Sequence, residues 1–240
     1  MCTNFESPQI ERFPVEFHWP IPTFAYRHEQ YPGYMAPIRL LDHASGDAEL
    51  REAMFGLVPF WSKDIKASRH TYNARTETVD SKPSYREPWK NRRYALVPMV
   101  RFYEPDYETG KPLRWKIERR DEHAFTVAAI WDFWRHPNGE GLHSFSMLTI
   151  NADDHPVMGR FHAPSDEKRS LVIVPPERRE AWLEATPEEA KGFLVPMPAD
   201  EFTATLAPKP RKTESAKKKK RRPASCLPPV SWYGLPDDLR

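Results

Sequence analysis

The chain has 240 residues, enough for one sizeable domain whose hydrophobic core needs no disulfide staples. Its two cysteines, Cys2 and Cys226, argue against a disulfide framework and favour a reducing compartment. The N-terminus lacks the basic and apolar regions of a signal peptide, and no run approaches the ~18 apolar residues of a membrane helix. We therefore expect a cytoplasmic protein without a membrane span.

Charge is distributed unevenly along the chain. The formal net charge is +2, yet residues 208–223 hold nine Lys or Arg and one Glu, which is +8 and leaves −6 for the remainder. The body of the protein is therefore mildly acidic. Any attraction for nucleic acid must come from a local basic patch or from this segment.

Most of the predicted regular elements are strands. Residues 5–35, rich in proline and aromatic residues, first predict an ordered but irregular N-terminal insertion. Runs of aromatic and β-branched residues with turn signals between them then predict strands. These runs are residues 36–41, 92–98, 101–104, 113–118, 125–131, 143–150 and 170–174. The predicted fold class is α+β, a mainly antiparallel curved sheet or barrel with short peripheral helices.

Helix signals are few and short. Asp47 can cap a first helix, and Pro176 suits the first position of a second one. Thr186, followed three residues later by Glu189, has the spacing of a capping box that opens a third. The three predicted helices are residues 47–54, 176–185 and 186–194.

The composition divides the chain into three parts. Residues 1–205 predict a single catalytic domain that includes the insertion. Residues 206–225 have the composition of a basic, flexible linker. Residues 226–240, with the sequence CLPPVSWYGLPDDLR, form a C-terminal tail.

The first four residues, MCTN, place a cysteine directly after the initiator methionine. If Met1 is removed, Cys2 carries an α-amine and a thiol on neighbouring carbons. Their reference pKa values are about 7.7–8.0 and about 8.5, so each offers some nucleophilic form near neutral pH. An aldehyde can condense with the amine to a Schiff base, which the sulfur then closes to a thiazolidine ring. A cysteine at position 2 also occurs by chance, so other motifs must support this reading.

Four further stretches supply that support: FGLVPFW (55–61), YNARTET (72–78), ALVPMVRFYEP (95–105) and LTINADDHPVMGRFHAP (148–164). In this order and spacing, with the N-terminal Met-Cys, the chain resembles the SOS response-associated peptidase family, the abasic-site processing proteins. The resemblance covers roughly residues 1–195 and is strongest over 55–104. Its most specific part is NARTET (73–78) followed by SYREPWKNRRYALVP (84–98).

The resemblance implies a function in the response to DNA damage. Such proteins bind single-stranded DNA that contains an abasic site, and Cys2 would form a covalent thiazolidine cross-link with the sugar aldehyde and so protect the lesion. A Schiff-base intermediate also makes lyase activity possible. We expect a monomer in the cytoplasm that associates with the nucleoid. No cofactor is implied, and no cluster of His, Cys and carboxylates has the spacing of a metal site.

Three residues join Cys2 as catalytic candidates. The Asn73 amide oxygen can accept a hydrogen bond from the α-amine, although an Asx turn is the ordinary role of such a residue. Glu104, the family's acid, can move protons if aromatic neighbours raise its pKa, although most strand-end glutamates are merely solvated. His162 is the candidate for the family's late histidine and would donate a proton. His155 is its competitor.

The predicted DNA contacts are basic and aromatic. Arg75 suits a phosphate beside the lesion, and its alternative is an ion pair with Glu77 or another carboxylate. Trp61 can stack on a base or pack in the core. The remaining candidates are Arg92, Arg93 and Arg101, with Trp89 as a further stacking residue.

The chain departs from the family pattern, and two other functions therefore stay open. Thr3 and Asn4 replace an expected Gly-Arg, Pro105 replaces a Trp, and HAPSDEKRS replaces His-x-Arg-Met-Pro. Arg101 can compensate for the lost arginine charge. The alternative hypotheses are that Cys2 is the N-terminal nucleophile of a self-processing peptidase, and that the chain binds single-stranded DNA without catalysis.

Overall fold

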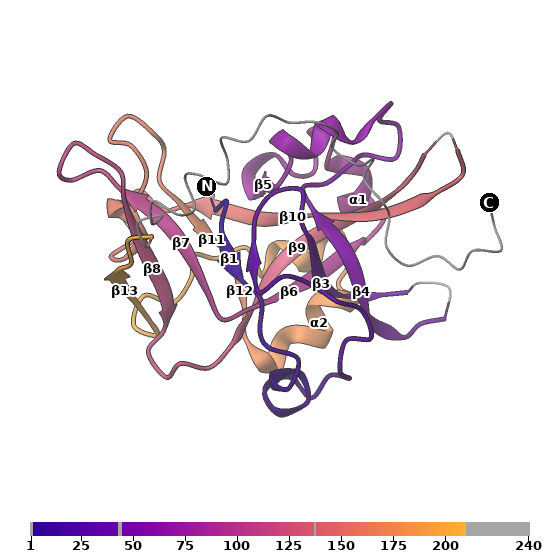
Figure 1. Cartoon of the computed structure of the whole chain (residues 1–240). Helices are drawn as coiled ribbons and strands as arrows, with labels where there is room; N and C mark the ends of the chain where they lie inside the picture. Colours follow the sequence, from indigo (N-terminus) through magenta and orange to yellow (C-terminus); the bar gives the residue numbers. More distant parts are fainter. Residues whose placement is uncertain (1, 43–44, 137, 210–240) are drawn as a thin grey trace, which may run out of the picture. The chain divides into compact units, whose positions relative to one another are not determined.

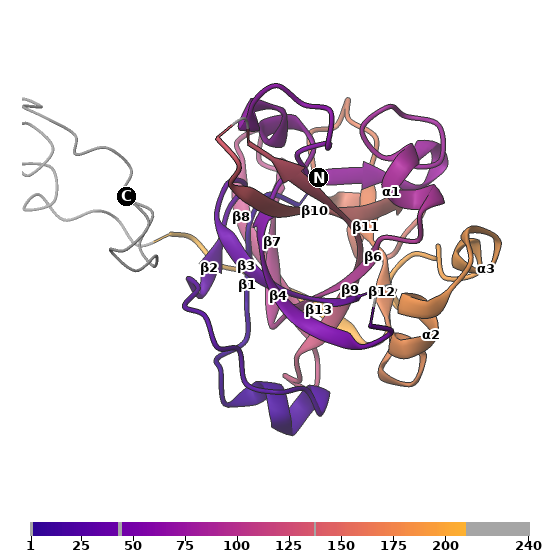
Figure 2. The ribbon, with the colours of Figure 1, turned by 90° about the vertical axis from the view of Figure 1, so that its right-hand side faces the viewer.

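A closed ring of paired strands is the centre of the computed structural model, which describes residues 2–42, 45–136 and 138–209 (Figure 1). Its strands are β3 (Met35–Leu41), β4 (Ala48–Phe55), β6 (Tyr94–Met99), β9 (Phe125–Arg135) and β10 (Gly141–Asn151). They pair in the order β10-β4-β3-β6-β9, and β9 also pairs with β10. Only the β4–β10 pairing in this ring is parallel. Because the circuit closes, these strands form a barrel without a free edge (Figure 2).

A second, antiparallel sheet carries the N-terminus. Its order is β13-β8-β7-β1-β2. Its strands are β1 (Phe5–Glu6), β2 (Glu29–Gln30), β7 (Arg101–Asp106), β8 (Leu113–Arg119) and β13 (Phe202–Leu206). Three short strands complete the ring's sheet: β5 (Asn73–Arg75) lies parallel to β10, β11 (Arg169–Leu171) antiparallel to β10, and β12 (Ile173–Val174) antiparallel to β9.

The helices are short and peripheral. The α-helices are α1 (Arg86–Lys90), α2 (Arg179–Glu184) and α3 (Pro187–Lys191). Figure 2 shows α2 and α3 outside the ring of strands. A π-helical turn covers Phe13–Phe17, and 3-10 turns cover Ile65–His70, Thr76–Thr78, Met158–Arg160 and Pro176–Arg178. In the described part of the chain, no helix has the length and apolar character required to cross a bilayer.

Two hydrophobic clusters lie on opposite faces of the barrel wall. Along β9, Val127 and Ala129 belong to a first cluster, whereas the alternate residues Ala128 and Ile130 belong to a second. The first cluster joins the barrel to the second sheet and includes Cys2. The second cluster includes the α2 residue Trp182 and the insertion residues Phe13, Phe17 and Trp19. β9 is thus buried on both faces, which explains its nearly continuous apolar sequence.

The predicted fold class and seven predicted strand regions are confirmed, with 170–174 divided between β11 and β12. The capping box is also confirmed: the Thr186 hydroxyl accepts from the Glu189 amide, and the Glu189 carboxylate accepts from the Thr186 amide. Of the helix predicted over 176–185, residues 176–184 are helical, as a 3-10 turn followed by α2, and Ala185 is the C-cap. The predicted linker and tail lie outside the described residues from position 210 onward.

The predicted helix at 47–54 is wrong, because this segment is strand β4. Residues 48–54 pair with β3 along the whole of that strand, from Ala48 opposite Leu41 to Met54 opposite Met35. Ala, Glu, Leu, Arg and Met favour a helix locally, yet the long pairing with β3 outweighs that preference. Asp47 sits in the connecting turn, where its carbonyl accepts from the Asp42 amide.

The loop that follows β4 is held close to the barrel at several points. The Gly56 amide donates to the Phe145 carbonyl at 3.0 Å. The Val58 amide donates to the Ser144 hydroxyl at 2.8 Å, and the Phe60 amide to the Asp132 carboxylate at 2.9 Å. These bonds fix the backbone of the FGLVPFW motif.

Gly56 is required at its position by both backbone conformation and space. Its φ is +113°, and a Cβ there would lie 2.4 Å from the carbonyl oxygen of Ser68. We expect Gly56→Ala to lower the free energy of unfolding by about 2–5 kcal/mol, measured by urea denaturation. Gly33→Ala is the matched control, since Gly33 has φ +90° but no atom within 4 Å of its Cβ position. Equal losses in the two variants would show that the contact with Ser68 contributes nothing.

Candidate active site

The second sheet delivers the N-terminus to the site. Phe5 pairs with Phe102 in β7, and the Tyr103 amide donates to the Asn4 carbonyl at 2.9 Å. The Asn4 side chain donates to the Gln30 carbonyl at 3.2 Å and accepts from Arg114 at 2.8 Å. Asn4, which replaces an arginine of the family pattern, therefore has a structural role. It locks the segment directly after Cys2.

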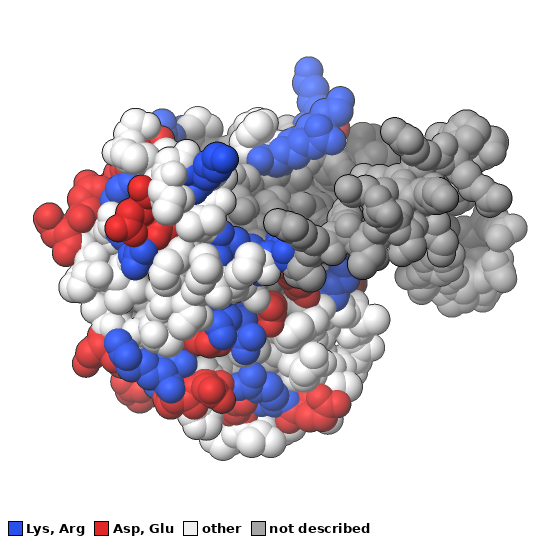
Figure 3. All heavy atoms as spheres, turned by 60° about the vertical axis from the view of Figure 1, so that its left-hand side comes forward, with Lys and Arg blue, Asp and Glu red and all other residues white. Residues whose placement is uncertain are grey.

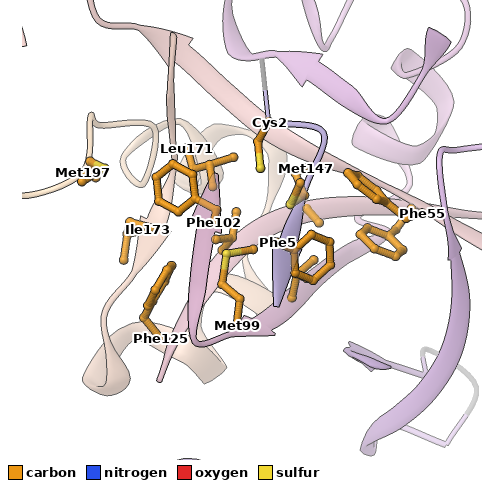
Figure 4. Close-up of a cluster of buried hydrophobic side chains, with 14 of the residues drawn as sticks. Cys2, Phe5, Phe55, Met99, Phe102, Phe125, Met147, Leu171, Ile173 and Met197 are labelled. Carbon is orange, nitrogen blue, oxygen red and sulfur yellow. The ribbon is translucent and has the colours of Figure 1, made fainter. Parts of the chain in front are cut away.

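Cys2 is almost completely buried. It is 1% exposed and belongs to the first hydrophobic cluster. Figure 4 shows its sulfur directed into this cluster, beside Met147. Burial and the neighbouring carboxyl of Glu104 raise the pKa of the thiol above its usual range. At neutral pH the thiol is protonated, so it needs a base when it reacts.

Asn73 contacts Cys2 directly. It lies in β5, opposite Met147 of β10, and its amide nitrogen donates to the Cys2 carbonyl at 2.8 Å. Its Oδ1 is buried and has no hydrogen-bond donor among the described residues. An acceptor without a donor in a buried site is costly unless another group supplies one. The α-amine of Cys2 is a group of the required kind, because it is a donor on the residue that Asn73 already holds.

Glu104 and His162 form a buried pair next to Cys2. Nδ1 of His162 lies 3.4 Å from Oε2 of Glu104, and the side chains are 7% and 3% exposed. Burial raises the pKa of Glu104 from 4.5 to about 7, and burial lowers the pKa of His162 from 6.5 to about 4. Near neutral pH the imidazole is therefore uncharged, and the carboxyl group is divided between its two protonation states.

The inserted run after His162 leaves this histidine at the site. His162 has a φ of 67°, and its amide donates to the Pro105 carbonyl at 2.9 Å. The Lys168 ammonium group donates to the carbonyls of His162 and Ala163, at 3.3 and 2.7 Å. These contacts hold the HAPSDEKRS run next to the segment that carries His162. Although this run differs from the family motif, His162 still lies beside Glu104.

His155, the competing histidine, makes contacts of a structural kind. Its Nε2 lies 2.7 Å from the Met197 carbonyl. Its Nδ1 accepts from the amides of Val157 and Met158, at 3.1 and 2.9 Å. Both ring nitrogens are therefore occupied by the backbone, and none of these contacts belongs to the Cys2 site.

Two tyrosines of the site were missed in the sequence. The half-buried Tyr72 has a pKa raised by burial and by the charges of Glu104 and Cys2, so its hydroxyl stays protonated and available as a donor. The Tyr85 hydroxyl donates to the Asn73 carbonyl at 3.0 Å and so helps to fix the backbone of the YNARTET motif. Tyr72 stands directly before Asn73, but an aromatic residue at a strand end is too common to mark a site.

The two charged residues of the YNARTET motif, Arg75 and Glu77, pair with different partners. Arg75 is half exposed and pairs with Glu167 at 2.7 Å. Glu77 instead accepts two bonds from the buried Arg169, at 3.0 and 2.7 Å, and these contacts hold the pKa of Glu77 at about 2. An exposed ion pair such as that of Arg75 is weak, so a phosphate can replace its carboxylate.

Three other predicted DNA contacts have internal partners. Arg92 donates to the carbonyls of Glu184 and Ala185 at the end of α2. Arg93 pairs with Asp132, which is completely buried. Arg101 lies between Glu6 and Glu118, at 3.7 and 3.2 Å. Each of these three guanidinium groups therefore has a structural role.

The tryptophans divide between surface and core. Trp61 and its neighbour Phe60 are each 54% exposed, on the loop that Gly56 and Asp132 hold in place. Trp89 is 3% exposed and packs against Tyr94. Because Trp61 is exposed on a loop that is held in place, its ring is available to stack on a base. Trp89 instead belongs to the second hydrophobic cluster.

The described surface shows no segregation of charge on the face seen in Figure 3, where basic and acidic side chains are interspersed. Basic side chains elsewhere also have acidic neighbours: Arg119 pairs with both Asp121 and Glu201. Among the residues that the structure describes, no group of three or more His, Cys, Asp or Glu side chains is arranged to hold a metal ion.

The barrel, the N-terminal cysteine and the buried Asn–Glu–His constellation together define the class of protein. The chain belongs to the SOS response associated peptidase (SRAP) family, whose sequence profile matches residues 1–209. It is 29% identical over 205 residues to the abasic site processing protein YoqW of Bacillus subtilis, covering 81% of this chain and 84% of that one. It is 28% identical over 140 residues to the rat abasic site processing protein HMCES, covering 46% and 40%.

Solved structures agree with this assignment. A crystal structure of a Bordetella bronchiseptica protein superposes with a TM-score of 0.79 at 30% identity, covering 86% of this chain and 99% of that one. A Bacteroides thetaiotaomicron protein shares the fold with a TM-score of 0.72 at 22% identity. The family resemblance of the motifs is thus confirmed.

The raised pKa of Glu104 predicts a cost in stability. The folded state holds a proton that the unfolded state releases between pH 4.5 and about 7, so this group lowers stability as the pH rises through that window. We expect Glu104→Gln to unfold at a higher temperature than the original protein at pH 8, by the equivalent of about 3 kcal/mol, with the difference vanishing at pH 4. Thermal unfolding at a series of pH values measures it.

Glu108→Gln is the control, because the Glu108 side chain is 79% exposed. It should leave the dependence of stability on pH unchanged. A Glu104→Gln protein that is as destabilised at pH 8 as at pH 4 would contradict the assignment of a raised pKa to Glu104.

Proposed function

We propose that this chain processes abasic sites in single-stranded DNA by forming a thiazolidine cross-link through Cys2. The observation that carries the proposal is the placement of Cys2 between Asn73 and the Glu104–His162 pair. Relatives named abasic site processing proteins support the substrate class. With Met1 removed, Cys2 has both the amine and the thiol that the ring needs.

The reaction balances with the loss of one water. The α-amine of Cys2 adds to the aldehyde carbon, and the carbinolamine loses its hydroxyl group as water to give the imine. The thiol then adds to the imine carbon, a C–S bond forms, and the thiol proton passes to the nitrogen. The Glu104 carboxylate accepts a proton from the α-ammonium group and returns it to the departing hydroxyl. A pKa of about 7 allows both directions of transfer.

Asn73 and His162 assist this sequence in different ways. Oδ1 of Asn73 accepts a hydrogen bond from the α-amine and thus orients its lone pair toward the aldehyde. The neutral His162 exchanges protons with Glu104 at 3.4 Å. As a base it can also remove a proton beside the imine carbon, which is the first step of β-elimination. Lyase activity would follow from the same intermediate.

Arg75 and Trp61 are the residues that we propose for the DNA itself. Arg75 can exchange Glu167 for a phosphate of the strand, and the exposed Trp61 can stack on an unpaired base. Arg92, Arg93 and Arg101 contribute less, because each already has an internal partner.

The family description also names a peptidase, which makes hydrolysis by Cys2 the second candidate function. The contact of His162 with Glu104 supplies the kind of proton acceptor that an N-terminal nucleophile uses. Turnover of a peptide substrate in the absence of DNA, abolished by Cys2→Ala, would favour this alternative.

Incubation with an abasic single-stranded oligonucleotide should yield a covalent adduct at Cys2. We expect intact-mass spectrometry to show protein without Met1 plus DNA minus one water, and peptide mapping to place the link at residue 2. Cys2→Ala should abolish the stable product, because the imine cannot close to a ring. Cys226→Ala, which removes the other cysteine, should react normally. Equal cross-linking by Cys2→Ala would overturn the proposal.

The rate of cross-linking should rise with pH through about 7, because the ionised form of Glu104 is the base. We expect Glu104→Gln to react roughly 100-fold more slowly at pH 8 and to lose the inflection near pH 7. Glu108→Gln should retain both the rate and the inflection. Single-turnover kinetics from pH 5.5 to about 8.5 measure the effect; an unchanged inflection in Glu104→Gln would assign it to another group.

A further inference from the structure

A cleft lies away from Cys2, beside β12 and α2. Figure 2 shows these two elements on one side of the ring. Its volume is about 590 Å³, within the range of sites that bind small molecules. The insertion, the start of β9, the β12–α2 connection and residues 193–201 contribute to its lining. None of the catalytic candidates lines it, so the proposed function does not account for it.

The cleft contains a buried cation. Arg179 lines it and is only 6% exposed. Its Nε donates to the Thr126 hydroxyl at 3.3 Å, and its guanidinium carbon lies 4.9 Å from the Phe17 ring centre and 5.7 Å from that of Trp19. Within the described ranges, no carboxylate lies at ion-pair distance from it. Burial lowers the pKa of Arg179 to about 10, as expected for a cation without a close counter-ion.

Three of the four carboxylates that line the cleft pair with other arginines, and the fourth, Glu177, is not at ion-pair distance from Arg179 within the described ranges. Asp121 and Glu201 both pair with Arg119, and Glu16 pairs with Arg12. They leave the charge of Arg179 without a direct partner. The lining cations are Arg119, Arg178 and Arg179, so the four carboxylates leave a formal excess of one negative charge, which disfavours a dianion such as phosphate more than a monoanion.

Apolar side chains make up much of the remaining lining, beside the polar residues Arg119, His123 and Arg178. Val15 and Val195 are 73% and 53% exposed, although both are hydrophobic. The other apolar lining includes four prolines and a phenylalanine: Pro175, Pro176, Pro196, Pro198 and Phe193. An apolar enclosure with one buried cation matches a ligand with an apolar body and one negative end.

We propose that this cleft binds a small organic monocarboxylate. Its carboxylate forms two parallel hydrogen bonds with the terminal nitrogens of Arg179, because Nε already donates to Thr126. Its hydrocarbon part covers the exposed faces of Val15 and Val195. A single negative charge satisfies the guanidinium and meets less repulsion from Glu16 and Glu201 than a dianion would.

The test uses the full chain and 4-phenylbutyrate as the probe, followed by NMR. We expect saturable shifts at the methyl groups of Val15, Ile173 and Val195, with a Kd on the order of 1 mM. The uncharged analogue 4-phenyl-1-butanol should bind at least ~10-fold more weakly, since it cannot form the charged pair. Inorganic phosphate should produce no saturable shift in the cleft.

Arg179→Met keeps much of the side-chain volume but removes the charge. It should lose the preference for 4-phenylbutyrate over the alcohol, and without ligand it should unfold at the same or a higher temperature. Arg179→Lys, which keeps the charge but not the paired donors, should bind several-fold more weakly and serves if the methionine variant does not fold. Arg86→Met, the control, should bind normally, because Arg86 does not line the cleft.

Three results would overturn the proposal: an alcohol that binds as tightly as the carboxylate, undiminished carboxylate binding by both Arg179 variants, or no saturable shift up to about 20 mM probe. Cross-linking to abasic DNA should be the same in Arg179→Met and in the original protein. A failure of the cleft proposal is thereby distinguished from a failure of the function proposed for Cys2.

Discussion

The pairing of β1 with β7 is the constraint on which the site depends. Only Phe5 and Glu6 form this strand, yet they connect the N-terminus to the strand that carries Glu104. The flanking bond from the Tyr103 amide to the Asn4 carbonyl extends the pairing toward Cys2. A nucleophile at residue 2 would otherwise belong to a chain terminus, which is poorly ordered unless the fold holds it.

Burial by the same cluster governs the chemistry of the three ionisable groups. It raises the pKa of the Cys2 thiol and of the Glu104 carboxyl, and it lowers that of the His162 imidazole. All three shifts favour neutral forms, as a site of low dielectric constant requires. Of the three groups, Glu104 therefore has the pKa nearest neutral pH, at a cost in stability that a more solvated carboxyl would not impose.

The motifs in the sequence supplied four catalytic candidates, because chemistry restricts which residue types suit such a site. Cys2, Asn73, Glu104 and His162 lie in four separate parts of the chain, and the structure brings them together. The surface candidates were harder to judge. Arg93 and Arg101 are basic in the sequence, but their carboxylate partners come from other strands and are invisible to local patterns.

Local composition also misled in one element. The segment at β4 has the residues of a helix, and only its pairing with β3 makes it a strand. Conversely, the helix at Pro187–Lys191 was readable, since a capping box is satisfied within four consecutive residues. Patterns that involve near neighbours can be interpreted from sequence, whereas those satisfied across the sheet cannot.

The sequence by itself determined the sheet-rich character and the family and named Cys2 as the candidate nucleophile, because alternating apolar residues and rare motifs are local properties. Tertiary structure alone decided that the barrel closes, that Glu104 and His162 meet, and that Arg179 faces a cleft without a carboxylate partner among the described residues. Each of these depends on distant segments being packed together. Burial and the resulting pKa shifts exist only once that packing has excluded water.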